Sequence, residues 1–401
     1  MKRVALLAAG ALAVRLIYVF AIAPEPVGIG GDASFYHSAA NLIADGHFFY
    51  RRIFGHAYPT ALHPPLYPLL LSVVSLVGGV HLLAHRLVGV VLGSVSVALI
   101  AVLGKRLGGE RAGLIAASLA AVYPPLITAD GSVMSEPVYV MIVIVALLLA
   151  LRPPTIRTAL ALGAVIGLGI LTRTEALFLL IFLLWPLRRR WPLIAATVVA
   201  AAIVISPWVI RNAVVFHRLE LAANYNTVIS AANCHQAYYG PDIGWWRLDC
   251  LARARTHHQL LIGDASATPG LRYARKHPAR AVLVAVVRVL RTFSFYQPLR
   301  IGNHEPRRRW FDALGLALYY PLLVLAALAL VSLRGRRWLL LAPVWTALVV
   351  GATGWGNSRF RIGADVSLIV LAAVAVDGRL LPPARLGRRR TEVANGLARP
   401  A

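Results

Sequence analysis

The chain has 401 residues, of which 59% are hydrophobic and only 14% are charged, and its mean hydropathy is +0.69. Soluble domains carry about 25% charged residues, so this composition excludes an ordinary soluble protein. The net charge of +25 does not indicate nucleic-acid binding, because the arginines form short runs at the ends of apolar segments. Apolar runs of nearly 20 residues recur along the chain and predict an all-α polytopic membrane protein.

The first predicted helix covers residues 4–23 and follows Lys2 and Arg3. The small residues at 21–23 also resemble the cleavage site of a signal peptide. Because Arg15 interrupts the apolar run and many spanning segments follow, we interpret this segment as an uncleaved helix with a cytoplasmic N-terminus.

Six basic clusters set the expected topology. If all six lie in the cytoplasm, two crossings must separate each neighbouring pair, which predicts about ten transmembrane helices in a single domain, 1–401. The clusters are Lys2/Arg3, Lys105/Arg106/Arg111, Arg152/Arg157, Arg188 to Arg190, Arg334/Arg336/Arg337, and Arg385 with Arg388 to Arg390. The helices are expected at residues 4–23, 86–103, 112–129, 137–151, 158–171, 176–187, 192–209, 311–331, 338–353 and 363–376.

The remaining segments divide between the two sides of the membrane. Residues 65–79 are short for a span, so we expect a re-entrant or juxtamembrane helix in the first outer loop, which covers about 24–85. A second long outer segment covers about 210–310, and its residues 273–291 have basic and apolar faces that favour the membrane surface. A basic tail at about 378–401 is expected in the cytoplasm, so that both termini lie inside.

Cys234 and Cys250 are the only cysteines, and both fall in the second outer segment. An oxidising compartment allows a disulfide between them, and two free thiols are the alternative. We expect the disulfide, because the predicted topology places both residues outside the cytoplasm.

Acids and bases from five outer loops are expected to converge on one side of the bundle. Asp32 is a candidate general base, and ionisable groups that survive near lipid usually serve chemistry or transport. Arginines offer planar donor forks for phosphate oxygens. We expect Asp32 and Glu136 to be catalytic, and His63, Arg173, Arg211, Arg359 and Arg361 to bind a donor phosphate. Tyr36, Asp130, Glu175 and Asn212 are expected in the substrate pocket.

Several of these residues also have structural interpretations. Arg211 follows an apolar helix and can extend its charge to the membrane surface, and Arg359 and Arg361 also flank a helix. Glu136 precedes Pro137 at a helix start, where a carboxylate stabilises the helix dipole. The sequence contains no His-Glu-x-x-His motif and no phosphate-binding glycine loop, so no metal site is predicted, and a divalent metal has no support from the sequence.

The motifs together resemble integral-membrane C-type glycosyltransferases. The stretches are Gly31-Asp32-Ala33-Ser34-Phe35-Tyr36, Leu42-Ile43-Ala44-Asp45-Gly46, His63-Pro64-Pro65-Leu66-Tyr67, Ser135-Glu136-Pro137, Leu171 to Leu177, Ser206 to Asn212, and Arg359-Phe360-Arg361. This series is similar to the family-39 group, which is related to protein O-mannosyltransferases and to lipid A aminoarabinose transferases.

The resemblance implies a bacterial inner-membrane enzyme with its active site on the outer face. It implies transfer of a hexose or pentose from a polyprenyl phosphate to a lipid, glycan or protein acceptor, with inversion at the anomeric carbon. The family's first-loop carboxylate matches Asp32, and its second-loop acid matches Glu136. Two positions depart from the family, because Ala33 stands where a second acid is common and His63 stands where some relatives have lysine.

Two other functions are compatible with this sequence. A transporter or lipid flippase also needs charge near the membrane, although its polar groups are expected at the bilayer midplane. A catalytically inactive assembly subunit is the other possibility, and the missing acid beside Asp32 favours it.

Overall fold

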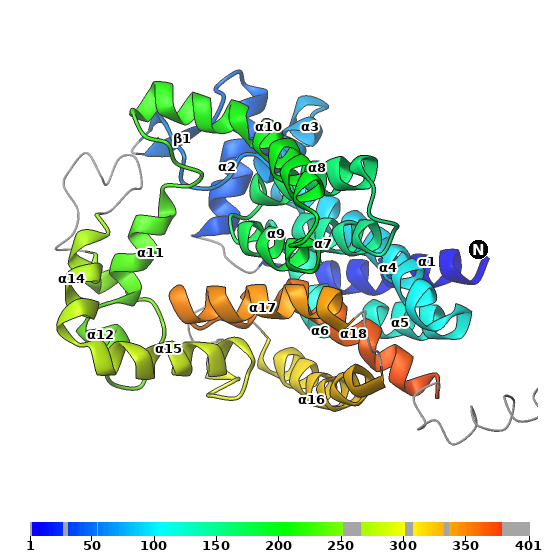
Figure 1. Cartoon of the computed structure of the whole chain (residues 1–401). Helices are drawn as coiled ribbons and strands as arrows, with labels where there is room; N and C mark the ends of the chain where they lie inside the picture. The colour runs from blue at the N-terminus through cyan, green and yellow to red at the C-terminus, as the bar shows by residue number, and fades with distance from the viewer. Residues whose placement is uncertain are drawn as a thin grey trace, which may run out of the picture.

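A computed structural model of the chain describes residues 2–26, 31–53, 55–251, 266–300, 308–332 and 337–378. The described part is helical apart from one two-stranded hairpin (Figure 1). The expected basic tail, from residue 379 onward, lies outside the described residues, as do Arg334 and Arg336.

The first half of the chain contains the hairpin. Its elements are α1 (Lys2–Ile17), the π-helix η1 (Tyr18–Ile22), α2 (Asp32–Ala44), β1 (Tyr50–Ile53), β2 (His56–Pro59), α3 (Leu66–Leu76), α4 (Leu82–Gly108), α5 (Glu110–Val122), α6 (Pro124–Asp130), α7 (Glu136–Ala150), α8 (Ile156–Ile170) and α9 (Ala176–Leu184). The second half contains η2 (Trp185–Leu187), α10 (Trp191–Phe216), α11 (Asn224–Ala232), α12 (His235–Tyr238), η3 (Leu248–Cys250), α14 (Thr268–Lys276), α15 (Pro278–Thr292), α16 (Arg309–Ser332), α17 (Arg337–Thr353), η5 (Ser358–Arg361) and α18 (Ile362–Val376).

All ten predicted apolar segments are helical in the structure, but the segment 112–129 is broken into two helices, α5 and α6. By length and apolar composition, four helices of the described chain are able to cross a membrane: Lys2–Ile22, Leu82–Gly108, Trp191–Phe216 and Arg309–Leu330. A fifth crossing is possible if α5 and α6, which are bent by 61°, form one span. The remaining apolar helices are shorter, so the predicted all-α polytopic membrane fold is confirmed while several of its helices do not reach full membrane length.

Proline determines where two of these helices begin or end. α5 ends at Val122 because Pro124 and Pro125 cannot continue its hydrogen-bond ladder, and the chain restarts in a new direction as α6. α3 starts directly after Pro65 and has only 11 residues. At 1.5 Å per residue it extends about 16 Å, which is too short to cross a hydrocarbon core of about 30 Å. Its length agrees with the expected re-entrant or juxtamembrane helix.

The hydrophobic core lies where α4, α5, α7 and α18 meet. α18 is buried almost along its whole length, from Ile362 to Val374. α2, which carries the predicted site residues Asp32 and Tyr36, lies with β1 and α11 at the end of the bundle opposite the N-terminus (Figure 1). The last described turn of α18 lies at the same end as Lys2, so the two described chain ends share one side.

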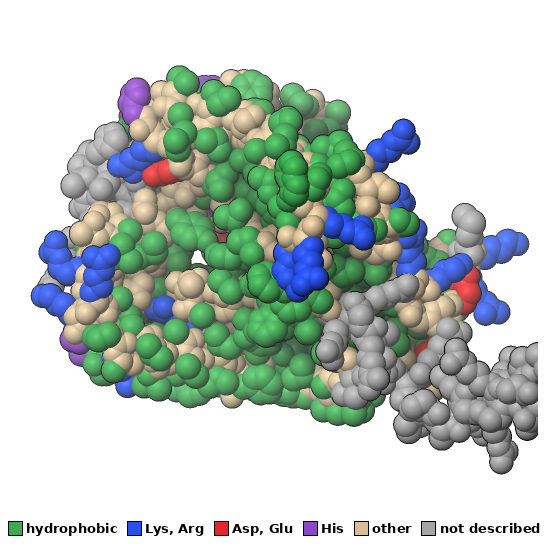
Figure 2. All heavy atoms as spheres, in the orientation of Figure 1, with side chains coloured by type: hydrophobic (Ala, Val, Ile, Leu, Met, Phe, Trp, Pro, Cys, Tyr) green, Lys and Arg blue, Asp and Glu red, His purple; other side chains and the backbone are tan. Residues whose placement is uncertain are grey.

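α15 confirms the predicted amphipathic character but turns its charged face inward. Arg288 and Arg291 are 3% and 2% exposed and donate to the backbone carbonyls of Ala232 and Ile243. Several of its apolar side chains point outward, with Val282 68% exposed, while Val284 is buried against the protein. Hydrophobic side chains cover the lower edge of the molecule over α15 and α16 (Figure 2). The helix therefore presents an apolar outer surface.

Candidate active site

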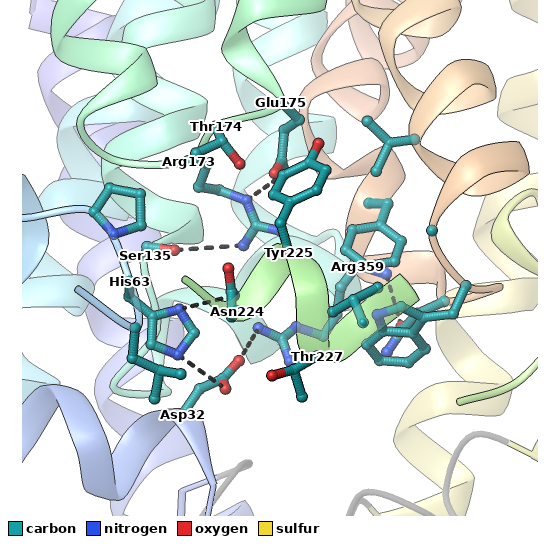
Figure 3. Close-up of a pocket in the computed structure, with 18 of the residues that line it drawn as sticks. Asp32, His63, Ser135, Arg173, Thr174, Glu175, Asn224, Tyr225, Thr227 and Arg359 are labelled. Atoms are coloured by element: carbon teal, nitrogen blue, oxygen red, sulfur yellow. Dashed lines mark hydrogen bonds and ion pairs between the residues drawn. The ribbon is translucent and has the colours of Figure 1, made fainter. Parts of the chain in front are cut away.

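Five segments far apart in the sequence surround one cavity of about 450 Å³. They are the first loop, the turn before α7, the turn between α8 and α9, the segment from α11 to η3, and residues 350–360. The molecular surface is hollowed between the region of α11 and the apolar bundle (Figure 2), and charged side chains point toward one another inside (Figure 3). The charged and histidine side chains that line the cavity are Asp32, Arg51, His63, Arg173, Glu175 and Arg359. The predicted convergence of these loops at one place is therefore seen in the structure, while their position on the outer side stays a prediction.

Asp32 reaches the cavity because it is the first residue of α2. A carboxylate in the first turn of a helix is stabilised by the helix dipole. Its side chain is 40% exposed. One turn later Tyr36 packs edge-on against Tyr67 of α3, with ring centroids 4.9 Å apart, and this contact fixes the orientation of α2.

A chain of alternating charges crosses the floor of the cavity. Arg359 Nη2 lies 3.4 Å from Asp32 Oδ2, although the two residues are 327 positions apart. Arg359 Nε donates to Glu136 Oε1 at 2.7 Å, and Arg173 Nη1 reaches the same oxygen at 2.9 Å. Arg173 Nε in turn donates to Glu175 Oε1 at 2.5 Å. Two arginines that are far apart in the sequence are thus held side by side.

Glu136 lies behind these arginines rather than in the cavity itself. Its side chain is only 2% exposed and does not line the main cavity. Its second oxygen, Oε2, has no hydrogen-bond partner among the described residues. Glu136 also lines a separate, small cavity of about 40 Å³, together with Ser132 and Ser358. This burial makes Glu136 suited to position Arg173 and Arg359, and it leaves Asp32 as the more accessible carboxylate.

His63 contacts the carboxylate of Asp32. Its Nε2 is 3.6 Å from Asp32 Oδ1, and its ring packs against Phe35 and Tyr36 with centroids 4.9 and 5.1 Å away. Burial lowers the pKa of His63, and this effect outweighs the opposing influence of Asp32, which raises it. The imidazole is therefore neutral at neutral pH and contributes orientation rather than charge.

Tyr36 and Glu175 line the cavity as expected, but Arg211 and Asn212 do not. Arg211 Nη1 donates to the carbonyl of Thr60 at 2.9 Å, and its Nη2 donates to the carbonyl of Phe49 at 3.1 Å. Asn212 Nδ2 donates to the carbonyl of Glu220 at 2.8 Å. Both side chains tie α10 to neighbouring loops, because buried carbonyls need donors.

Arg361 and Asp130 are also outside the cavity. Arg361 Nε donates to Asp365 Oδ1 at 3.2 Å, one turn along α18, and both side chains are buried. Asp130 receives a hydrogen bond from Arg15 Nε at 2.7 Å and fills the space beside Gly93, where a Cβ atom would lie 2.1 Å from its carboxylate. Buried charges require a counter-charge, and each of these residues finds one within the bundle.

Several cavity residues are absent from the predicted site. Asn224 approaches His63, with Nδ2 and Nδ1 3.5 Å apart, and Ser135 lies 3.4 Å from Arg173 Nη1. The remaining ones of note are Arg51, Tyr225, Trp246 and Trp355. The sequence signals that pointed to these residues were the tryptophan pair Trp245-Trp246 and the basic pair Arg51-Arg52. A single sequence does not show that such pairs share a cavity.

The disulfide between Cys234 and Cys250 is present, with Cα atoms 6.2 Å apart. The disulfide closes a loop that contains Trp246, and Trp246 lines the cavity. Among the described residues, no group of three or more histidine, cysteine, aspartate or glutamate side chains is arranged to hold a metal ion.

Comparisons with known proteins agree with this architecture. The sequence profile of a family described as dolichyl-phosphate-mannose-protein mannosyltransferase matches residues 62–210, which include His63, Glu136 and Arg173. None of the curated proteins matches the chain in sequence.

Several solved structures have a similar fold, among them those of ArnT and AglB. The crystal structure of ArnT from Cupriavidus metallidurans bound to undecaprenyl phosphate superposes with a TM-score of 0.57 and 18% identity, covering 96% of this chain and 62% of ArnT. The archaeal oligosaccharyltransferase AglB from Archaeoglobus fulgidus, in complex with an inhibitory peptide and a dolichol-phosphate, gives a TM-score of 0.55 and 16% identity, covering 100% of this chain and 52% of AglB. The chain thus spans between half and two thirds of the length of these structures.

Proposed function

We propose that this chain, a multi-pass membrane protein with the fold of the C-type glycosyltransferases, transfers a sugar from a polyprenyl phosphate to an acceptor on the outer membrane face. The resemblance to enzymes related to protein O-mannosyltransferases and aminoarabinose transferases is confirmed by the profile match and by the similar folds of ArnT and AglB. The polyprenyl-phosphate donor, the outer face and inversion are our proposals.

One observation carries the proposal: Asp32 and Arg359 meet at 3.4 Å in a cavity that is open to a substrate. A glycosyl transfer needs a base for the acceptor and cations for the departing phosphate. Asp32 supplies the first, and Arg359 with Arg173 supplies the second, because Glu136 holds both guanidinium groups at the same place. Arg51 adds a further positive charge to the cavity wall.

The proposed reaction is a single displacement. The acceptor oxygen or nitrogen bonds to the anomeric carbon as the bond between that carbon and the phosphate oxygen breaks. The acceptor proton passes to Asp32, and the lipid phosphate leaves with one additional negative charge. The arginines stabilise that developing charge, which is where a preorganised site contributes most to the rate.

The missing acid beside Asp32 does not weaken this mechanism. Ala33 is fully buried in an apolar cluster with Tyr67 and Val133, so a carboxylate at this position would face the core rather than the cavity. A single displacement needs one base, and Asp32 is 40% exposed while Glu175 is paired tightly with Arg173. The arrangement supports inversion at the anomeric carbon.

The test is the release of lipid phosphate by the purified protein in lipid nanodiscs. Decaprenyl phosphates carrying labelled mannose, glucose or arabinose are incubated with the protein and with acceptors from an envelope extract. An enzyme converts one of them to decaprenyl phosphate, and Asp32→Asn does not. A flippase moves the intact lipid between leaflets without releasing phosphate, and an inactive subunit does neither.

A further inference from the structure

We propose that Trp246 and Trp355 form a platform in the cavity on which a sugar ring stacks. The inference rests on the proposed function and extends it to the group that is recognised. Both rings line the cavity and lie 6.0 Å apart, at an interplanar angle of 59°. Neither takes part in the chain of charges that holds the arginines.

The surrounding residues hold Trp355 in a fixed place. The buried ring of Trp245 meets it edge-on at 4.7 Å, and the ring of Phe360 meets it edge-on at 5.1 Å. The backbone amide of Gly356 donates to the carbonyl of Gly244 at 2.9 Å, which ties the two tryptophan-bearing segments together. A platform with this support loses little entropy when a ligand stacks on it.

Close backbone packing explains why glycine neighbours these tryptophans. A Cβ atom on Gly356 would lie 2.6 Å from the side chain of Arg291, so only glycine allows this approach. Gly244 has a φ of +81°, a conformation that glycine adopts without strain. Trp246 in turn packs against Ala231 and Leu251, next to the Cys234–Cys250 disulfide. The two segments are built as one rigid wall.

The position of the wall favours a sugar over a lipid tail. Phe360 links the tryptophans to the charged floor, because the Arg173 guanidinium lies 6.0 Å from its ring centroid. Hydroxyl and amide side chains, including Thr227, Thr353 and Asn224, line the same cavity. A pyranose or furanose presents C–H groups on its faces and hydroxyls at its rim, so flat rings beside hydrogen-bonding groups match it. An isoprenoid chain has no hydroxyls for these groups.

Binding measurements on the full chain in nanodiscs test the platform. The first arm compares decaprenyl phosphate with decaprenyl phosphates carrying mannose, glucose or arabinose. The second arm measures saturation-transfer NMR signals of the methyl glycosides of these sugars, with decaprenyl phosphate saturating the protein. The variants are Trp355→Ala, Trp246→Ala and Trp355→Phe, with Trp191→Ala as the matched control, because Trp191 is 74% exposed and does not line the cavity.

We expect both alanine variants to weaken sugar-dependent binding about three- to tenfold, with Trp355→Phe and Trp191→Ala near wild type. A loss confined to the glycosylated lipids assigns the platform to the donor sugar, and a loss confined to the methyl glycosides assigns it to the acceptor. Equal weakening of bare and glycosylated lipid overturns the proposal, as does unchanged binding in both variants or a wild type that binds none of the sugars. Failure of the proposed function is seen separately in the release assay, because a wild type that is not a transferase releases no decaprenyl phosphate, whatever its affinity for the sugars or the lipid.

Discussion

Substituting Asp32 and Glu136 separately should distinguish the base from the residue that holds the arginines. Asp32→Asn keeps the shape of the side chain and removes its charge. The contacts of Asp32 with His63 and Arg359 are 3.6 and 3.4 Å long, and its side chain is 40% exposed. Such partly exposed pairs contribute about 0–1 kcal/mol, so the variant should fold with nearly wild-type stability. Its transfer rate should fall by about 10²- to 10⁴-fold, as for loss of a general base.

Glu136→Gln should lower the stability of the protein, which Asp32→Asn should leave nearly unchanged. The carboxylate is 2% exposed and accepts from two guanidinium groups at 2.7 and 2.9 Å. Removing one charge from a buried network of this kind costs about 3–5 kcal/mol, so this variant should unfold at a clearly lower temperature and should also lose affinity for the lipid phosphate.

Two measurements on each variant provide the comparison. Thermal stability is followed by size-exclusion chromatography after heating, and transfer is followed by release of decaprenyl phosphate. Asp32→Asn with wild-type turnover would refute the assignment of the base. Asp32→Asn that is as unstable as Glu136→Gln would show that Asp32 is part of the structural network instead.

Three further predictions follow from the site. Arg359→Ala should weaken decaprenyl phosphate binding at least tenfold, whereas Arg361→Ala should mainly lower the unfolding temperature, because Arg361 is buried against Asp365; equal affinities for both variants would contradict this. Since burial lowers the pKa of His63, the unfolded chain binds more protons below pH 6.5, and stability should fall as the pH decreases from 6.5. A pH titration of melting temperature should show a weaker fall in His63→Asn, and identical curves would disprove the contribution. Replacing Cys234 and Cys250 by serine should destabilise the segment by about 3 kcal/mol, the chain-entropy value for a loop of this length, with faster proteolysis between them as the readout; unchanged proteolysis would argue against it.

Hydropathy and charge patterns predicted the helices well. They did not predict which polar side chains are buried in the bundle and which reach the cavity. Each predicted span is helical, although 112–129 is broken into α5 and α6, and Asp32, His63, Arg173 and Arg359 meet in one cavity because loops on one side of a bundle converge. Arg361 differs from Arg359 by two positions, yet one side chain is buried in the bundle and the other reaches the cavity. Both belong to the short 3₁₀ turn η5, in which residues two positions apart point in different directions, and the sequence does not reveal which direction faces the cavity.

The same limit applies to the short elements of the loops. The β1–β2 hairpin was not expected, because its pairing of Tyr50 with Pro59 depends on a turn whose register the local sequence leaves open. α15 was expected as an amphipathic helix, but which of its two faces meets the protein could not be decided. Its arginines turn inward because unpaired backbone carbonyls lie there.

The inward arginines of α15 connect the tryptophan-bearing wall of the cavity to the medium that surrounds the protein. Arg280, Arg288 and Arg291 hold the backbone of Tyr238, Ala232 and Ile243, which flank the tryptophan segment, while the opposite face of the helix requires an apolar medium. We infer that the medium around this helix acts on the proposed sugar platform through α15. Short-chain detergents, which wet that face poorly, will loosen this wall before they unfold the spanning bundle.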